Sequence, residues 1–165
     1  MNYPPTIIIR HSRENLKKCS LRGLEKRPDF QFYTYPDCAL GKEKLPDLSD
    51  YIALDLEGPP FSSADSGSGL ILLDATWRLA EKMNRLILPL QKVKRRRIPT
   101  GFVTAYPRRQ EDCPDPTVGL ASIEALYIAY QLLGRDCQGL LDTYHWRDLF
   151  LEKNGLVHFF RERMH

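Results

Sequence analysis

The segment from Gly69 to Leu86 constrains the fold more than any other part of the chain. It opens with a continuous apolar run that ends in Asp74 and is followed by Thr76 and Trp77. Apolar residues then recur at helical spacing as far as Leu86. This pattern predicts a buried strand that turns directly into an amphipathic helix. The segment therefore indicates an α/β protein.

The turn after this strand is a candidate ligand site. In open α/β sheets, ligands bind at the carboxyl ends of the strands. Here that end presents the Asp74 carboxylate, the Thr76 hydroxyl, the Trp77 indole and the unpaired N–H groups of a helix N-terminus. A structural role is the alternative, in which Asp74 or Thr76 caps the helix and Trp77 fills the core.

The rest of the chain supplies further strands and helices. Runs of β-branched and aromatic residues predict strands over 6–10, 30–35 and 51–56, and one or two short strands within 96–105. Helical spacing predicts a short broken helix over 15–26 and helices over 119–133, 139–153 and 156–163. The Gly- and Ser-rich stretch 61–69 marks a boundary. We expect a small N-terminal α/β lobe over 1–66 and a second α/β domain over 67–165.

Composition excludes several classes of protein. No apolar run approaches the roughly 20 residues that span a bilayer, and no secretory signal is visible, so we expect a cytoplasmic protein with no membrane partner. The four cysteines contain no C-x-x-C pair and the four histidines lack the spacing of metal ligands. We therefore expect reduced thiols and no metal.

Basic charge is concentrated just after the candidate site. Between Arg78 and Arg109 the chain carries ten Lys or Arg residues and one acid, Glu81. Such clustering is typical of surfaces that bind phosphate backbones, although a merely solvated charged face is the alternative. The residues expected to contact RNA are Arg78, Lys82, Arg85, Lys94, Arg95, Arg96, Arg97, Arg108 and Arg109.

Several short motifs, in order along the chain, resemble one superfamily. Asp-Ala-Thr-Trp at 74–77 matches the Asp-x-Thr-Trp signature of the DTW domain, and His-Ser-Arg-Glu at 11–14 resembles a motif of its tRNA branch. Lys-Lys-Cys-Ser at 17–20 and the segment 150–154 resemble the small-subunit rRNA aminocarboxypropyltransferases. The helix start at 120–126 matches both branches. The tRNA branch's cysteine cluster is absent, and Tyr-Pro replaces the Asn-Pro of the rRNA branch.

The resemblance implies a SPOUT-like α/β domain with a deep trefoil knot over 67–165, whose loops bind S-adenosylmethionine. Apolar walls suit a flat adenine, and a few polar groups fix its orientation. The residues expected to bind the cofactor are Ser20, Leu54, Leu56, Thr76, Trp77, Phe102, Val103, Leu120, Ser122 and Glu124. Asp74 is the candidate catalytic residue, which would accept the base's proton or hold the cofactor's amino group; its role as a helix cap stays open.

The same resemblance implies transfer of the 3-amino-3-carboxypropyl (acp) group to N3 of a uridine-type base. The expected partner is structured RNA, with small-subunit rRNA first and tRNA second, and we expect a monomer. Three other readings stay open: a SPOUT-type RNA methyltransferase that uses the same cofactor, a non-catalytic RNA-binding module, and a protein-interaction domain without RNA.

Overall fold

A computed structural model describes residues 3–13, 20–107 and 119–156. The predicted helix over 156–163, Arg108 and Arg109 therefore lie outside the described residues, as does the first part of the predicted helix over 15–26. The backbone of Trp77 is described but its side chain is not.

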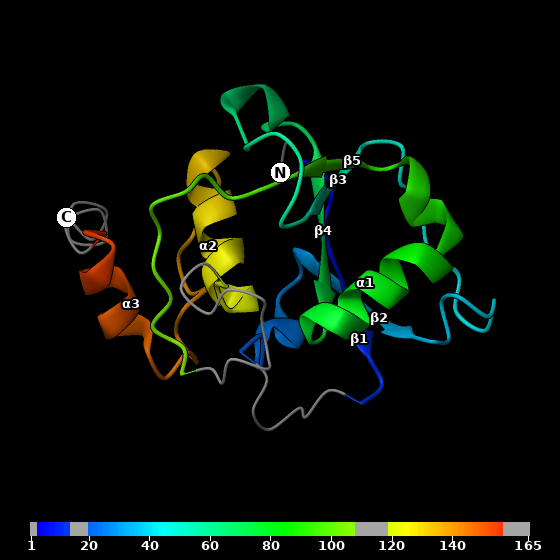
Figure 1. The fold of residues 1–165 in the computed structure, drawn as a ribbon, viewed down its shortest axis with the longest axis horizontal. Coiled ribbons are helices and arrows are strands. Elements are labelled where there is room, and N and C mark those ends of the chain that lie inside the picture. Colours follow the sequence, from blue (N-terminus) through cyan, green and yellow to red (C-terminus); the bar gives the residue numbers. More distant parts are fainter. Residues whose placement is uncertain (1–2, 14–19, 108–118, 157–165) are drawn as a thin grey trace.

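The centre of the structure is a parallel sheet, and its strands within the described ranges are β1 Thr6–His11, β2 Phe30–Tyr35, β3 Tyr51–Leu54, β4 Gly69–Asp74 and β5 Lys94–Arg96. They lie in the order β2-β1-β4-β3-β5 (Figure 1). Every neighbouring pair is parallel. All carboxyl ends therefore meet at one edge of the sheet.

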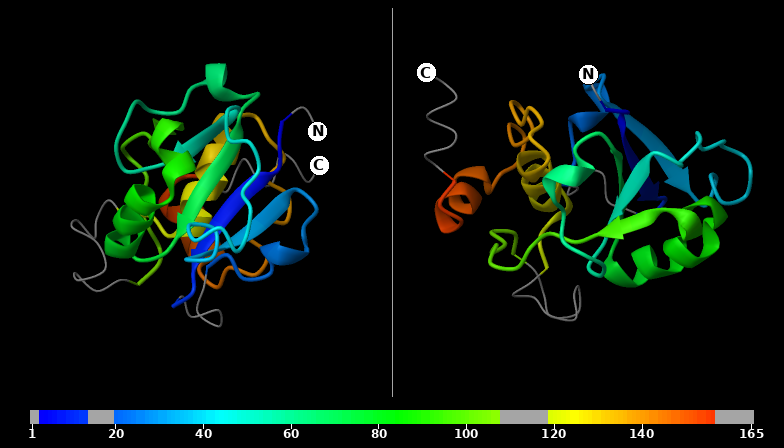
Figure 2. Two further views of the ribbon diagram at one scale, coloured as in Figure 1. Left: turned by 90° about the vertical axis from the view of Figure 1, so that its right-hand side faces the viewer. Right: turned by 90° about the horizontal axis from the view of Figure 1, so that it is seen from above.

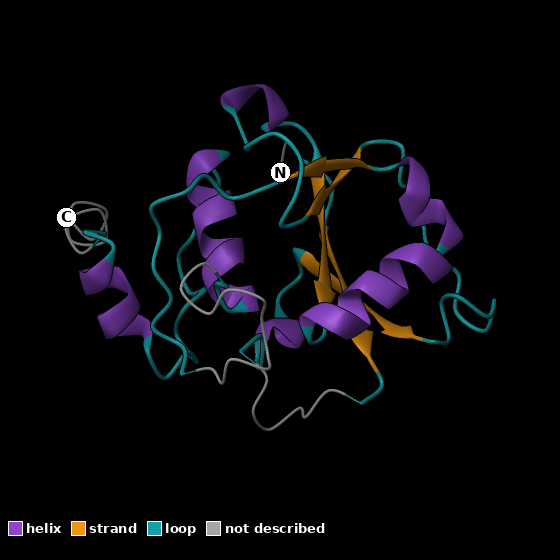
Figure 3. Cartoon of the chain, viewed as in Figure 1, coloured by secondary structure: helices purple, strands orange, loops and turns teal. Residues whose placement is uncertain are grey.

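Helices cover both faces of this sheet. The α-helices of the described ranges are α1 Trp77–Leu86, α2 Ser122–Leu132 and α3 Arg147–Lys153. Three short 3-10 segments accompany them, namely η1 Leu24–Lys26, η2 Ser63–Asp65 and η3 Leu88–Lys92. Helix α1 and η3 lie on one face and α2 on the other, with α3 outside α2 (Figures 2 and 3). The predicted mixed α/β class is confirmed.

Alternate residues of the strands belong to two hydrophobic cores, one on each face of the sheet. Ile7 and Ile9 of β1 belong to the cluster under α1, which includes Met83, whereas Ile8 belongs to the cluster under α2, which includes Leu126. All five side chains are fully buried. Burying each of them stabilises the fold by roughly 1.5–3 kcal/mol. A strand that is buried on both faces must be continuously apolar, which is why the runs in β1 and β4 do not alternate.

Two strand predictions need correction. The third strand ends at Leu54, not Leu56, and Leu56 is 61% exposed. The strands expected within 96–105 are wrong, because β5 covers 94–96. Strand β5 pairs with β3 at the edge of the sheet, where Lys and Arg side chains are tolerated. Pro99, which has no N–H to donate, lies just beyond it and cannot extend the ladder.

The helix predictions are partly confirmed. Helix α2 ends before Gly134, whose φ of +70° lies in the left-handed region that terminates helices. The helix expected over 139–153 covers only 147–153, and the preceding residues form turns with Leu140 and Leu141 buried. On α1, Leu86 was expected in the core but is half exposed.

The predicted division into domains over 1–66 and 67–165 stays a prediction. Strands from the two ranges alternate in the sheet, because β4 pairs with both β1 and β3. The two ranges therefore share one sheet and its two cores.

Gly69 provides a test of how closely β3 and β4 approach. A Cβ at Gly69 would overlap the ring of Tyr51, which is buried and whose hydroxyl donates to the Pro5 carbonyl at 2.8 Å. Because the ring cannot move away cheaply, we expect Gly69→Ala to lower the free energy of unfolding by about 1–3 kcal/mol. Urea denaturation measures it. Gly67→Ala is the matched control, since a Cβ there meets no atom within 4 Å. Equal midpoints for the two variants would contradict this packing.

Candidate functional site

The order of the strands indicates where a ligand crevice is expected, at the carboxyl edge of the sheet. β1 and β4 are neighbours, but the chain leaves β1 toward β2 on one side and leaves β4 toward β5 on the other. A reversal of this kind opens a crevice between the two carboxyl ends, where open α/β sheets bind their ligands. The candidate site therefore begins at the ends of β1 and β4.

An ion pair occupies this position. Arg10 and Asp74 are register partners on β1 and β4, and Arg10 Nε donates to Asp74 Oδ2 at 3.0 Å. The Asp74 side chain is 5% exposed. Arg10 also donates to Glu25 at 3.1 Å and lies over the Phe32 ring, 4.9 Å from its centroid. The carboxylate predicted to be catalytic is thus held by a fixed guanidinium.

The structure settles one of the alternatives for the turn after β4. Thr76 occupies the N-cap position of α1 without a side-chain hydrogen bond to the helix, so its hydroxyl is not a cap.

The ion pair of Arg10 affects Glu25. Burial acts to raise the pKa of Glu25, but hydrogen bonds from the backbone and from Arg10 outweigh it and lower that pKa. Arg10 was missed from the sequence, where the one available signal was a charged residue ending an apolar strand.

His11 lies on the opposite face of β1 from Arg10, 5.2 Å from the ring centroid of Tyr35. Its Nδ1 accepts a hydrogen bond from the Arg13 backbone N–H at 3.0 Å. Burial lowers the pKa of His11, and the charges of Arg13 and Lys82 lower it further. The imidazole is therefore neutral at pH 7, and its surroundings are positively charged.

Three of the predicted apolar residues pack on the α2 side of the sheet. Leu54 at the end of β3, Phe102 in the loop after β5 and Leu120 before α2 are half-buried against the core cluster under α2. Leu56 and Val103 are more open, at 61% and 43% exposed. Contact of these five residues with a ligand stays a prediction.

Hydroxyl groups lie at the N-terminus of α2. The Ile123 N–H donates to Ser20 Oγ at 3.3 Å, so Ser20 caps α2 from a distant part of the chain. Ser122, the first residue of α2, is half-buried beside it. The predicted residues Ser20 and Ser122 are therefore close together.

Glu124 holds the loop after β5. This fully buried carboxylate accepts four hydrogen bonds: from the Ala121 N–H at 2.7 Å, the Ala105 N–H at 2.8 Å, the Thr104 hydroxyl at 2.6 Å and the Tyr144 hydroxyl at 2.9 Å. Both of its oxygens are therefore engaged within the protein, and its contact with the cofactor stays a prediction.

The basic residues separate into two groups. Arg78, Lys82 and Arg85 are exposed on α1, whose N-terminus starts at the carboxyl edge. In contrast, Arg95 pairs with Asp55 at 2.8 Å, and Arg96 pairs with Asp65 at 3.3 Å.

The partners of Arg95 and Arg96 lie in the segment after β3, so these two arginines hold that segment against β5. Arg97 is half-buried, and its backbone N–H donates to Pro59. Lys94 is exposed at the opposite, amino edge. Of the predicted RNA contacts, those on α1 are best placed.

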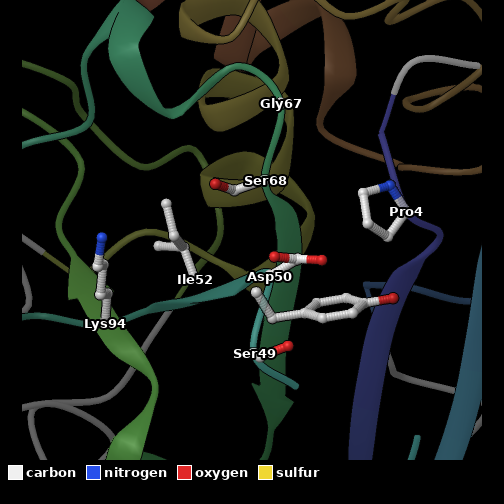
Figure 4. Close-up of a pocket in the computed structure, with 8 residues that line it drawn as sticks. Pro4, Ser49, Asp50, Ile52, Gly67, Ser68 and Lys94 are labelled. Atoms are coloured by element: carbon white, nitrogen blue, oxygen red, sulfur yellow. The ribbon is translucent and has the colours of Figure 1, made fainter. Parts of the chain in front are cut away.

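A cavity of about 320 Å³ opens at that amino edge, away from the candidate site. Figure 4 shows Lys94 and Pro4 on opposite sides of it, with Asp50 and Ser68 between them. Its walls carry both signs of charge and come from the starts of β3, β4 and β5. Its position at the amino ends, and not its volume, argues against it as the ligand site.

No helix in the described ranges is long and apolar enough to cross a membrane. Within the same ranges, no three His, Cys, Asp or Glu side chains gather as a metal site would require.

The fold and site define a three-layer α/β protein with its candidate ligand crevice at the carboxyl ends of β1 and β4. No protein-family model matches the chain, and no curated protein matches it. Its fold is similar to that of Tsr3 from Vulcanisaeta distributa, described as an SAM-dependent rRNA:acp-transferase, with a TM-score of 0.67 and 23% identity. The match covers 92% of this chain and 79% of that one. The two chains share a fold.

Glu124 allows the internal frame of the site to be tested. Glu124→Gln keeps the shape but turns an amide NH₂ toward groups that themselves donate hydrogen bonds. We expect the free energy of unfolding to fall by about 1–3 kcal/mol, because buried donors lose their acceptor. Chemical denaturation gives this value. Glu152→Gln, at an exposed carboxylate of α3, is the control and should have no measurable effect. Equal stability of the two variants would show that the buried carboxylate is dispensable.

Proposed function

We propose that this protein is an S-adenosylmethionine-dependent RNA aminocarboxypropyltransferase. The observation that carries the proposal is the likeness in fold to the rRNA:acp-transferase Tsr3 along 92% of the chain. The ordered motifs of the sequence support it independently, because they point to the same activity. The trefoil knot implied by those motifs belongs to the same proposal.

The residues at the carboxyl edge fit the cofactor chemically. Leu54, Phe102 and Leu120, which pack against the core cluster under α2, would supply apolar surface to an adenine, and the exposed Leu56 and Val103 would cover its other face.

Polar groups near the N-termini of α1 and α2 support the same proposal. Ser20 and Ser122 present hydroxyls near the N-terminus of α2, where a carboxylate is favoured. Thr76 and Trp77 begin α1 at the same edge. When bound, S-adenosylmethionine supplies a sulfonium that activates the acp group for transfer.

Asp74 is the candidate catalytic residue of this proposal. N3 of a uridine-type base must lose its proton as the new C–N bond forms and the C–S bond breaks, leaving methylthioadenosine. A carboxylate held by Arg10 Nε at 3.0 Å is fixed in orientation and can stabilise the positive charge of a cofactor amino group or accept that proton. Arg10 is then a positioning residue for Asp74.

The proposed partner is structured RNA, with small-subunit rRNA as the first choice and tRNA as the second. The target base must leave its stack to reach a crevice at the sheet edge. Arg78, Lys82 and Arg85 on α1 would bind the flanking phosphates. A SPOUT-type RNA methyltransferase is the second candidate, because it would use the same cofactor and surface.

Labelled cofactor separates these two reactions. We expect S-adenosylmethionine labelled in its methionine carboxyl carbon to transfer label to RNA, and methyl-labelled cofactor to leave the RNA unlabelled. The measurement is scintillation counting of purified RNA followed by mass spectrometry of its nucleosides. Asp74→Asn should reduce transfer by about 100-fold or more if the carboxylate acts in the reaction. Methyl label in the RNA would overturn the proposed chemistry, while carboxyl label confined to tRNA would keep the chemistry and change the substrate.

Salt dependence tests the RNA surface. We expect replacement of Arg78, Lys82 and Arg85 by Ala to reduce the slope of log K against log salt by about two to three, because each lost phosphate contact removes roughly one counterion from the release. Filter binding or fluorescence anisotropy gives the slope.

The control for the RNA experiment is the double variant of Lys92 and Lys94, which are exposed in the neighbouring segment that leads to the amino edge. The double variant should leave the slope unchanged. If it reduced the slope more than the triple variant of α1 does, the RNA would bind at the amino edge of the sheet instead. Arg95 and Arg96 are unsuitable probes, because their ion pairs hold the fold.

A further inference from the structure

The loop of residues 102–106, here the cofactor loop, is held by side chains from two helices. Glu124 of α2 binds Thr104 and the backbone of Ala105. Asn154, which follows the last turn of α3, binds both the N–H and the carbonyl of Val103. The Val103 N–H donates to Asn154 Oδ1 at 2.7 Å, and Asn154 Nδ2 donates to the Val103 carbonyl at 2.8 Å.

Asn154 is itself anchored to α3. Its Nδ2 also donates to the Phe150 carbonyl at 2.8 Å, and its backbone forms the C-cap of the helix. The helix is in turn docked by Phe150, which is fully buried, and Leu151, which is 4% exposed. The amide therefore connects a rigidly packed helix to the cofactor loop.

These bonds do not serve to bury Val103, whose side chain is 43% exposed. Its neighbour Phe102 is half-buried against the core. A loop backbone that is fixed by two hydrogen bonds while its apolar side chain stays open is preorganised for contact with something else. Fixing such a loop before binding raises affinity by removing the entropic cost of ordering it.

We propose that Asn154 is a positioning residue that sets the affinity for S-adenosylmethionine by holding the backbone of Val103. This inference rests on the proposed function, in which Phe102 and Val103 line the cofactor site. Helix α3 is then part of the site's construction, although it presents no side chain to the cofactor. An amide is required, because Asp at this position would keep the acceptor for the Val103 N–H and lose both donated bonds.

Calorimetric titration with S-adenosylmethionine tests the proposal. Asn154→Ala should weaken binding by about tenfold, because the Val103 backbone would then have to be ordered when the cofactor binds. Asn154→Asp should weaken it as well. Lys153→Ala, an exposed neighbour on α3, is the matched control and should bind as the wild type does. Titrations are run well below each variant's melting temperature, so that a loss of stability alone does not change the dissociation constant.

Amide exchange of the wild-type protein provides a second measurement that needs no variant. Because coupling between two sites is reciprocal, bound S-adenosylmethionine should slow exchange of the Val103 N–H. Unchanged exchange in the presence of bound cofactor, or Asn154→Ala that binds with the wild-type dissociation constant, would overturn the role of Asn154 and leave the proposed function standing. Failure of the wild-type protein to bind the cofactor would overturn both.

Discussion

The position of β4 between β1 and β3 determines where the candidate site lies. Because β2 lies beyond β1 and β5 lies beyond β3, the chain leaves β1 and β4 toward opposite sides of the sheet. Open α/β sheets bind their ligands at such a reversal of strand order. The Arg10–Asp74 pair lies at this point, and Leu54, Phe102 and Leu120 pack on the α2 side of the sheet. The candidate site is thus a consequence of strand order, and the loops refine it.

The loops themselves depend on buried polar contacts. Regular structure satisfies its own backbone groups, but an irregular segment such as 97–106 has to find partners elsewhere. Glu124 supplies acceptors to the middle of this segment, and Asn154 supplies both a donor and an acceptor to Val103. Side chains on or next to two helices that pack against the core, α2 and α3, therefore fix the backbone of the loop. A site with fixed geometry requires that its loops be held by rigid elements in this way.

The sequence alone predicted the helices and strands that leave a periodic pattern of apolar residues. The apolar run over 69–74 and the spacing in α2 predicted a strand and a helix that the structure confirms, because burial on both faces or on one stripe leaves a periodic pattern. The hydrophobic pattern failed to predict elements whose conformation is set by contacts with distant parts of the chain. β5 is formed by basic residues that no strand pattern would select, and its strand character comes from pairing with β3.

The same limit applies to the site. Leu54, Phe102 and Leu120 were predicted from their apolar character, and the structure brings them to one cluster. Arg10 and Asn154 were missed, because their importance depends on contacts with residues 64 and 51 positions away. Glu124 was assigned to the cofactor, and that assignment stays a prediction; the sequence did not show that its buried carboxylate holds the loop at Thr104 and Ala105.

The Arg10–Asp74 pair also limits how such a site could accelerate a reaction. Breaking a buried ion pair by removing one partner leaves an uncompensated charge and costs about 3–5 kcal/mol, so the pair is maintained while a ligand binds and leaves. A carboxylate held in this way has a fixed direction, which suits it to orienting a positively charged group. A sulfonium is already an activated leaving group, so most of the rate in the proposed reaction would come from alignment of the base with the carbon to be transferred. In the proposed reaction, the main contribution of the site would be its rigidity, with Arg10 holding Asp74 and with Glu124 and Asn154 holding the loop of residues 102–106.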